Sequence, residues 1–124
     1  MVFTNTGVQQ TIWRIGSNIG SFIEFFAIGI GSGTALVTNV TLVNESGARA
    51  SITGSPNFTE ARKVTFQGDF NSVRMSGMQL TEFGLFSSGA SNVGSIWLRE
   101  SFPSITFDGT NELQISASIE GTAG

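Results

Sequence analysis

Apolar and polar residues alternate along much of this chain of 124 residues. The alternation is unbroken over the eight positions from Leu113 to Glu120, and it recurs from Val64 to Phe70. A period of two is typical of a β-strand with one buried face and one face toward water. We therefore expect a strand over each segment. In the segment 113–120, the side chains expected to face the core are Leu113, Ile115, Ala117 and Ile119.

Two shorter segments also have the pattern of strands. Residues 96–99 predict a strand at an edge or an interface, because Trp97 opposes its apolar face. Residues 105–107 predict another short strand, which is followed by the turn sequence Asp108-Gly109-Thr110-Asn111. An Asp-Gly pair between two alternating apolar runs is a strong signal for a hairpin. We therefore expect the strands on the two sides of this turn to pair.

The most apolar segment, Phe22 to Ile30, is apolar on both faces apart from Glu24. Such a strand is either central and covered on both sides or half of a subunit interface. Its nine residues are too few to cross a bilayer as a helix, which takes about 20. The glycines that follow, in Gly29-Ile30-Gly31-Ser32-Gly33, depart from the dinucleotide fingerprint by one position and precede no amphipathic helix, which indicates a plain loop.

The segment 78–86 changes phase. Met78 and Leu80 are in one phase, and Phe83 and Leu85 are in the other. A change of phase within one strand is typical of a β-bulge. We expect the bulge next to Glu82 and Gly84.

Glu82 is the most informative charged residue, because it lies inside this apolar strand. A buried carboxylate must be paired or must accept several hydrogen bonds. The guanidinium fork of an arginine fits a carboxylate with two bonds, and Arg49 and Arg99 are the expected partners. We expect a structural clamp that holds the bulged strand against a loop. A general-acid role for Glu82 is the alternative.

The N-terminal part has the pattern of a helix. Val8, Ile12, Ile15 and Ile19 are spaced by four, three and four residues, and Thr6 is placed to cap the helix. Thr11 and Trp13 would also fit a strand. We expect at most one short helix near residues 8–15, within an arm or helix that spans residues 1–20.

Together these segments predict a single domain over residues 1–124. The strands of five to nine residues are separated by turns rich in Gly, Ser and Asn. This spacing predicts an all-β fold, an antiparallel β-sandwich of jelly-roll-like type with seven to nine strands.

Composition narrows the chemistry. The chain has no cysteine and no histidine, which excludes disulfides and thiolate metal sites and removes the commonest general base. Its net charge of −3 argues against a nucleic-acid surface, and its first residues lack the basic and apolar parts of a secretory signal. We expect no catalytic site, no cofactor, no metal, no membrane partner and no nucleic-acid partner.

Segments in one order along the chain resemble small β-sandwich virion proteins of tailed bacteriophages and related tailed viruses. They are Phe26–Thr34 with Leu42–Glu45 and Arg49, Leu80–Phe86, Ile96–Ile105 and Leu113–Ile119. The chain departs from the pattern where Ile30 and Ser32-Gly33 replace a Thr-Gly-Thr stretch. The resemblance covers residues 22–120, implies a structural role in the virion, and brings no catalytic residues.

We expect a non-enzymatic virion protein, either a capsid decoration or cement subunit or a related head or tail component. The expected partners are further copies of the chain, most simply in a trimer, and other virion proteins such as the major capsid or tail proteins. The alternatives are a tail-fibre or receptor-binding module for a host glycan or protein, and a small hydrolase. The side chains expected at interfaces are Trp13, Phe22, Phe25 and Trp97.

Overall fold

The fold is that of a computed structural model, which describes residues 2–17, 22–58, 60–94 and 96–121. Within these ranges the chain forms seven strands and two helices. In chain order they are β1 (Val2–Phe3), α1 (Asn5–Ser17), β2 (Phe25–Gly29), β3 (Ala50–Ser51), β4 (Lys63–Phe70), α2 (Ser72–Met75), β5 (Gln79–Phe86), β6 (Ile96–Thr106) and β7 (Leu113–Glu120).

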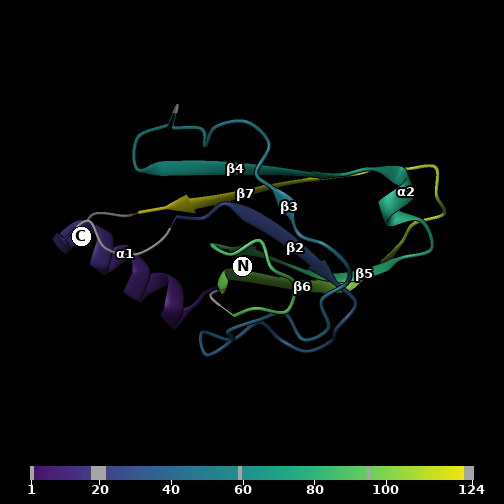
Figure 1. The fold of residues 1–124 in the computed structure, drawn as a ribbon, viewed down its shortest axis with the longest axis horizontal. Coiled ribbons are helices and arrows are strands. Elements are labelled where there is room, and N and C mark those ends of the chain that lie inside the picture. Colours follow the sequence, from purple (N-terminus) through teal and green to yellow (C-terminus); the bar gives the residue numbers. More distant parts are fainter. Residues whose placement is uncertain (1, 18–21, 59, 95, 122–124) are drawn as a thin grey trace.

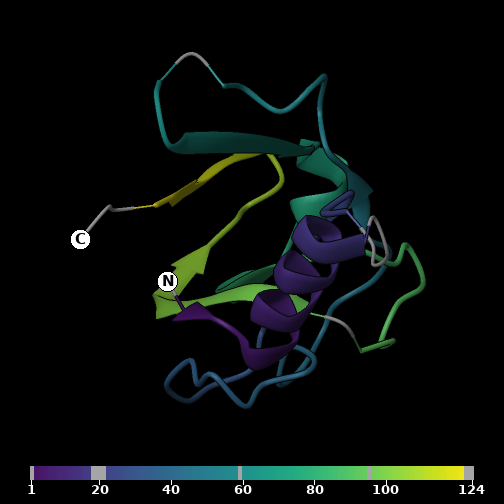
Figure 2. The ribbon, with the colours of Figure 1, turned by 90° about the vertical axis from the view of Figure 1, so that its left-hand side faces the viewer.

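The strands form two antiparallel sheets, which confirms the expected all-β sandwich-like fold. One sheet has five strands in the order β1-β6-β5-β2-β3, and the other consists of β4 and β7. In Figure 1, β4 and β7 run together along the top, with α1 at one end of the molecule and α2 at the other. Figure 2 shows the loop after β2 on the side of the five-stranded sheet opposite β4.

The strands β4 and β7 confirm the two clearest alternating segments. They pair without a break from Lys63 opposite Glu120 to Phe70 opposite Leu113. Ile115 and Ala117 are buried in the main core, and Leu113 and Ile119 pack against that core while partly exposed. Gln114 and Ser116 face outward and Ser118 is half-buried. The expected register of this strand is therefore confirmed.

The strand β2 is central, between β5 and β3, so the first of the two readings of the Phe22–Ile30 segment holds for β2, while Phe22 and Ile30 at the ends of the segment are exposed. Phe26 and Ile28 face the main core between the sheets. Ala27 faces the opposite side, where it packs with Leu42, Phe86 and Ile96 in a smaller cluster. Its two apolar faces are thus covered within one chain.

The strand β6 corrects two expectations. The segments 96–99 and 105–107 are not separate strands, because β6 runs from Ile96 to Thr106. It lies inside the sheet between β1 and β5, so it is not an edge strand over residues 98–99, where β1 pairs with it.

The expected hairpin after β6 is also wrong. The turn itself forms, since Thr110 donates its backbone N–H to Asp108 Oδ1 at 3.0 Å. It leads from the five-stranded sheet to β7 in the other sheet, and β7 pairs with β4. The chemistry of a turn is local, whereas the choice of a strand's partner depends on distant segments.

An irregularity lies next to Glu82, as the change of phase predicts. Leu80 pairs with Ile105 and Glu82 pairs with Ser101, so two steps along β5 match four steps along β6. The additional residues therefore belong to β6. Along β5, Leu80 and Leu85 face the main core, while Phe86 packs in the smaller cluster on the opposite side.

The N-terminal helix is confirmed, but its start is corrected. It begins at Asn5, and its cap is Thr4 rather than Thr6. Thr4 Oγ1 accepts a hydrogen bond from Gly7 N at 3.1 Å, and the side chain of Thr4 is fully buried. A further single helical turn, α2, follows Asn71, whose side chain caps it.

Candidate functional site

Glu82 is fully buried and saturated with hydrogen-bond donors. Its Oε1 accepts from Val43 N at 2.9 Å and from Arg99 Nε at 3.1 Å. Its Oε2 accepts from Gly31 N at 2.9 Å and from Asn44 N at 2.8 Å. A second guanidinium nitrogen of Arg99 lies 3.1 Å from Oε1. A carboxylate can be buried only with such compensation.

Arg99 extends the same network to the rest of the loop. It is 1 % exposed, and it donates to the carbonyl oxygens of Thr34 at 3.1 Å and Gly33 at 3.3 Å. It also donates to Asn39 Oδ1 at 3.2 Å. We call Glu82, Arg99 and the loop groups bound to them the charged clamp. The clamp holds the loop of residues 31–44 against the five-stranded sheet.

Two glycines make room for the carboxylate. A Cβ on Gly31 would lie 2.6 Å from Val43 Cβ and in collision with Glu82 Oε2. A Cβ on Gly29 would lie 2.6 Å from Glu82 Oε2. The Gly-x-Gly pattern that begins at the last residue of β2 is therefore needed for the close approach of the loop backbone to Glu82.

Arg49 is not a partner of Glu82, which corrects one of the two expected pairings. It forms a two-bond ion pair with Glu45, with Nε and one terminal nitrogen each 2.9 Å from a carboxylate oxygen. It donates to the carbonyl oxygens of Ser88 at 2.8 Å and Val93 at 2.7 Å. Its guanidinium carbon lies 3.6 Å from the ring centre of Phe86. Arg49 thus joins the same loop to the segment after β5.

The arrangement of the charged clamp suits a structural role. Both oxygens of Glu82 face donors, so the carboxylate has no open side from which to deliver a proton to a substrate.

Within the described ranges, no group of three acidic residues is placed to hold a metal ion. In that part of the chain, no helix is long and apolar enough to cross a membrane.

Trp97 corrects the set of residues expected at interfaces. It is 6 % exposed and packs in the main core, with its ring 6.4 Å from that of Phe3. It is buried because β1 pairs beside it and α1 packs against β6. Phe22 and Trp13 are exposed, as an interface role requires, and Phe25 is half-buried.

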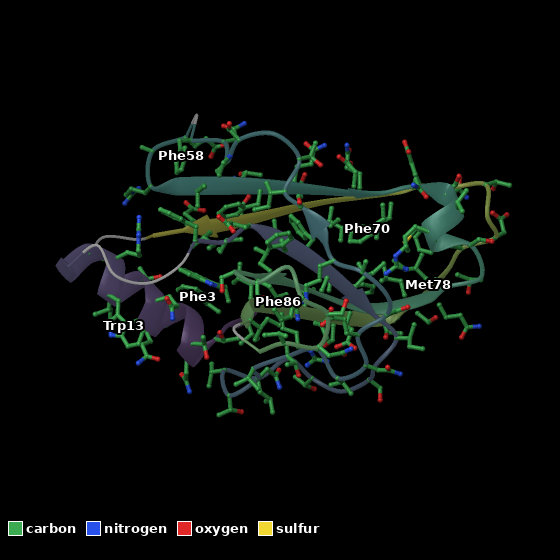
Figure 3. The ribbon with its side chains drawn as sticks, in the orientation of Figure 1. Phe3, Trp13, Phe58, Phe70, Met78 and Phe86 are labelled. Atoms are coloured by element: carbon green, nitrogen blue, oxygen red, sulfur yellow. The ribbon has the colours of Figure 1, made fainter. Side chains whose placement is uncertain are left out.

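An apolar groove of about 890 Å³ opens between α1 and the two-stranded sheet. Figure 3 shows Phe3 and Phe58 at this end of the molecule and Trp13 on α1. In the groove wall, Trp97 Nε1 is a buried donor without a hydrogen-bond partner among the described residues. Apolar side chains from distant parts of the sequence line the groove, among them Phe3, Ile15, Phe22, Phe58, Phe66 and Ile119.

The helix α1 turns its apolar side away from the sheets. Gly7 is buried and Thr11 and Arg14 are half-buried, so the inward side is small and polar. On the outward side, Ile12 is 61 % exposed and Ile15 is 82 % exposed. We call Val8, Ile12, Trp13 and Ile15 the helix face. Ile19, the last member of the expected stripe, lies outside the described residues.

Comparison with protein families, with curated proteins and with solved structures finds no match for this chain. Function is therefore inferred from the geometry and from the resemblance of the sequence.

Sequence reasoning found Glu82 and Arg99 but missed Glu45 and Thr4. Glu45 stands four residues before Arg49, but this spacing indicates pairing only on a helix, and residues 45–49 are not helical, so no local pattern pointed to the pair. Nothing in the local pattern distinguishes Thr4 from Thr6 as the cap, because both are threonines that precede the apolar stripe. The choice depends on β6, since Thr4 N donates to Trp97 O at 2.8 Å.

Proposed function

We propose that this protein is a non-enzymatic structural subunit of a virion, a capsid decoration or cement protein or a related head or tail component. It acts by binding further copies of itself and other virion proteins such as the major capsid or tail proteins. The observation that carries the proposal is the helix face, whose apolar side chains are exposed although the helix is amphipathic.

An amphipathic helix normally turns its apolar stripe toward the core. In α1 the residues at 7, 11 and 14 point inward, and the apolar residues at 8, 12 and 15 point outward. Contiguous exposed apolar surface of this kind is typical of an interaction site. The neighbouring groove adds further apolar surface from Phe22 and Phe58.

The distribution of charge supports the same proposal. Glu82, Arg99, Glu45 and Arg49 all lie inside the protein or under loops, in a chain of which only 12 % is charged. The surface that remains is low in charge, and charged residues are depleted at the centres of protein interfaces. The virion setting is supported by the sequence resemblance to small β-sandwich virion proteins.

A trimer is the assembly that we propose. Apart from Ile15, which belongs to both, the helix face and the groove are formed by different residues, so a contact of the helix face of one copy with the groove of another is heterologous. A heterologous contact gives a ring where its rotation closes and an open filament where it does not, and three copies make the smallest such ring. The strand β2, which is apolar on both faces, is not an argument for self-association, because the chain itself covers both faces.

The test compares two variants by light scattering at tens of micromolar. We expect Ile12→Ser with Ile15→Ser to dissociate the oligomer with little change in melting temperature, since both residues are exposed. The matched control is Val73→Ser on α2, which removes an equally exposed apolar side chain outside the helix face. A wild-type protein that is monomeric under these conditions would contradict the proposed self-association. The position of the chain in an image of the intact particle tests the virion role directly.

A receptor-binding module is the second candidate, and the aromatic lining of the groove favours it. Phe22 and Phe58 are exposed at the groove, and aromatic side chains supply much of the energy in recognition sites. If the groove binds a host surface and not another copy, Phe58→Ser will leave the oligomer intact and abolish adhesion of the particle to host cells, whereas a groove filled by another copy would make the same variant dissociate the oligomer.

A further inference from the structure

The two outer edges of the two-stranded sheet differ. The outer edge of β4 is covered by the loop before it, through Thr53 N to Gln67 O at 2.7 Å and a reciprocal pair between Asn57 and Thr65 at 2.9 Å. Along the outer edge of β7, no described strand or loop is hydrogen-bonded to the backbone. The described residues therefore close one edge of this sheet and leave the other without a hydrogen-bonded neighbour.

The phase of the ladder shows which backbone groups point outward from β7. Gly121 N donates to Arg62 O at 2.8 Å, which marks a hydrogen-bonded pair just beyond the end of the strands. Because hydrogen-bonded and non-bonded pairs alternate, the outward groups of β4 include those of Thr65 and Gln67. These are the two β4 residues that bond the covering loop, so the phase is correct. On β7 the outward groups belong to Gln114, Ser116, Ser118 and Glu120.

The remaining edges are protected in the usual ways. The outermost strands of the five-stranded sheet, β1 and β3, have two residues each. The strand β6 carries Pro103 and two register shifts. Short strands, proline and bulges all discourage pairing with another chain. By contrast, β7 has eight residues in unbroken register with β4, no proline, and one charged residue, Glu120.

We propose that β7 pairs antiparallel with β7 of a second copy across a two-fold axis, which joins the two small sheets into one sheet of four strands. The register places Ala117 opposite Ala117, with Ser116 opposite Ser118 and Gln114 opposite Glu120. All four outward residues then lie in hydrogen-bonded pairs, and each pair exchanges two backbone bonds. This inference rests on the proposed self-association and adds a second contact to it, because a two-fold contact through β7 joins two of the proposed trimers into an assembly of six copies.

The β7 sequence is self-complementary in this register. Its single carboxylate, Glu120, meets the amide of Gln114 rather than a second carboxylate, so no like charges oppose each other. The small residue Ala117 lies at the axis, where the chains come closest. On the same face, Ile115 meets Ile119, so the two apolar cores become continuous.

The existing ladder contains side-chain pairs of the same type. Ser118 Oγ lies 2.8 Å from the hydroxyl of Thr65 on β4. The amide of Gln114 donates to Asp69 at 3.3 Å. Hydroxyl–hydroxyl and amide–carboxylate pairs across strands are thus already part of how β7 binds a neighbour.

The first test is the mass of the assembly by light scattering for Ser116→Pro and for its control, Ser116→Ala. The N–H of Ser116 points away from β4, so proline removes a donor at the new contact and none from the β4–β7 ladder. We expect Ser116→Pro to halve the mass and Ser116→Ala to leave it unchanged. An unchanged mass for a folded Ser116→Pro protein overturns the proposal.

A pair of double variants tests the contact without proline. Ser116→Glu with Ser118→Glu places like charges opposite each other at both pairs and should halve the mass. Ser116→Glu with Ser118→Lys places opposite charges there and should retain it. Equal masses for the two variants overturn the proposed register.

Cross-linking locates the axis, because the natural chain has no cysteine. Ala117→Cys places two thiols opposite each other in a non-bonded pair, within the distance that a disulfide spans. Oxidation should therefore yield a covalent dimer. The control, Ser116→Cys, places its thiols diagonally and should yield at least several-fold less. Equal yields contradict the two-fold axis at Ala117.

The two proposals fail in different ways. A wild-type monomer overturns both the self-association and the β7 contact. A wild-type trimer whose mass none of the β7 variants changes overturns the β7 contact alone. Both contacts are supported if the wild-type assembly has six copies and each variant breaks one contact. Ser116→Pro should then leave trimers, and Ile12→Ser with Ile15→Ser should leave dimers.

Discussion

The two sides of the five-stranded sheet are covered in opposite ways. On one side the loop after β2 is held down by charges, through Glu82 with Arg99 and through Glu45 with Arg49. On the other side β4 and β7 cover the sheet by apolar packing and leave an open groove next to α1. Two ion pairs of this protein are thus internal, whereas its apolar helix face is external.

This contrast separates folding from assembly. Removing charges from water costs free energy that their mutual attraction repays only with good geometry, so a buried pair fixes one conformation more than it adds stability. The charged clamp therefore defines the path of a long loop that has little regular structure. The apolar surface of the helix face gains its free energy only when another surface covers it.

Breaking the charged clamp has the largest expected effect on stability. Glu82→Gln leaves the guanidinium of Arg99 buried without a counter-charge, so we expect the free energy of unfolding to fall by about 3 kcal/mol. Urea denaturation measures the change, and the order of the oligomer should remain the same. The control is Glu112→Gln, an exposed residue between β6 and β7, which should have little effect. Equal midpoints for the two variants would disprove a structural role for the clamp.

The second pair on the clamped side is expected to contribute less. Arg49→Lys keeps the charge but loses the two-bond geometry with Glu45 and the stacking on Phe86. We expect a loss of about 2 kcal/mol in the free energy of unfolding, typical of hydrogen bonds to charged groups. Calorimetry measures this loss. A loss as large as that of Glu82→Gln would contradict the expectation that the pair of Glu45 and Arg49 contributes less to stability than the charged clamp.

On the open side, the helix cap is expected to have a smaller effect. Thr4→Ala removes the acceptor for Gly7 N, and we expect it to lower stability by about 1 kcal/mol. Thr6→Ala is the matched control, because Thr6 lies inside the helix and caps nothing. If Thr6→Ala were the more damaging change in thermal denaturation, the helix would begin where the sequence pattern predicts.

The smallest effect concerns an exposed carboxylate, in contrast to the buried one of Glu82. Thr53 Oγ1 donates to Asp69 Oδ2 at 2.6 Å, and this bond lowers the pKa of Asp69 below its usual value. Because the folded pKa is depressed, the stabilisation is present above the unfolded pKa of about 3.9 and is lost as pH falls through the folded pKa. Thr53→Val should raise the pKa of Asp69 in an NMR titration. The pKa of Asp108, which Thr110 lowers, should not change.

Prediction from the sequence succeeded where a property is local. The alternation of residues 113–120 located β7 and its buried face, and the spacing of apolar residues located α1. The burial of Glu82 could be foreseen because its strand is apolar. Choosing Arg99 over Arg49 required the structure, because β6 pairs with β5 and brings Arg99 beside Glu82.

The sequence by itself determined the fold class, the main strands, the helix and the need to neutralise Glu82, since periodicity and the cost of a buried charge act within one segment. The tertiary structure decided that β7 joins β4 rather than β6, that Trp97 is buried, and that α1 turns its apolar side outward. These outcomes depend on contacts between segments far apart in the chain, which no local pattern specifies. The same contacts leave the helix face and the edge of β7 uncovered.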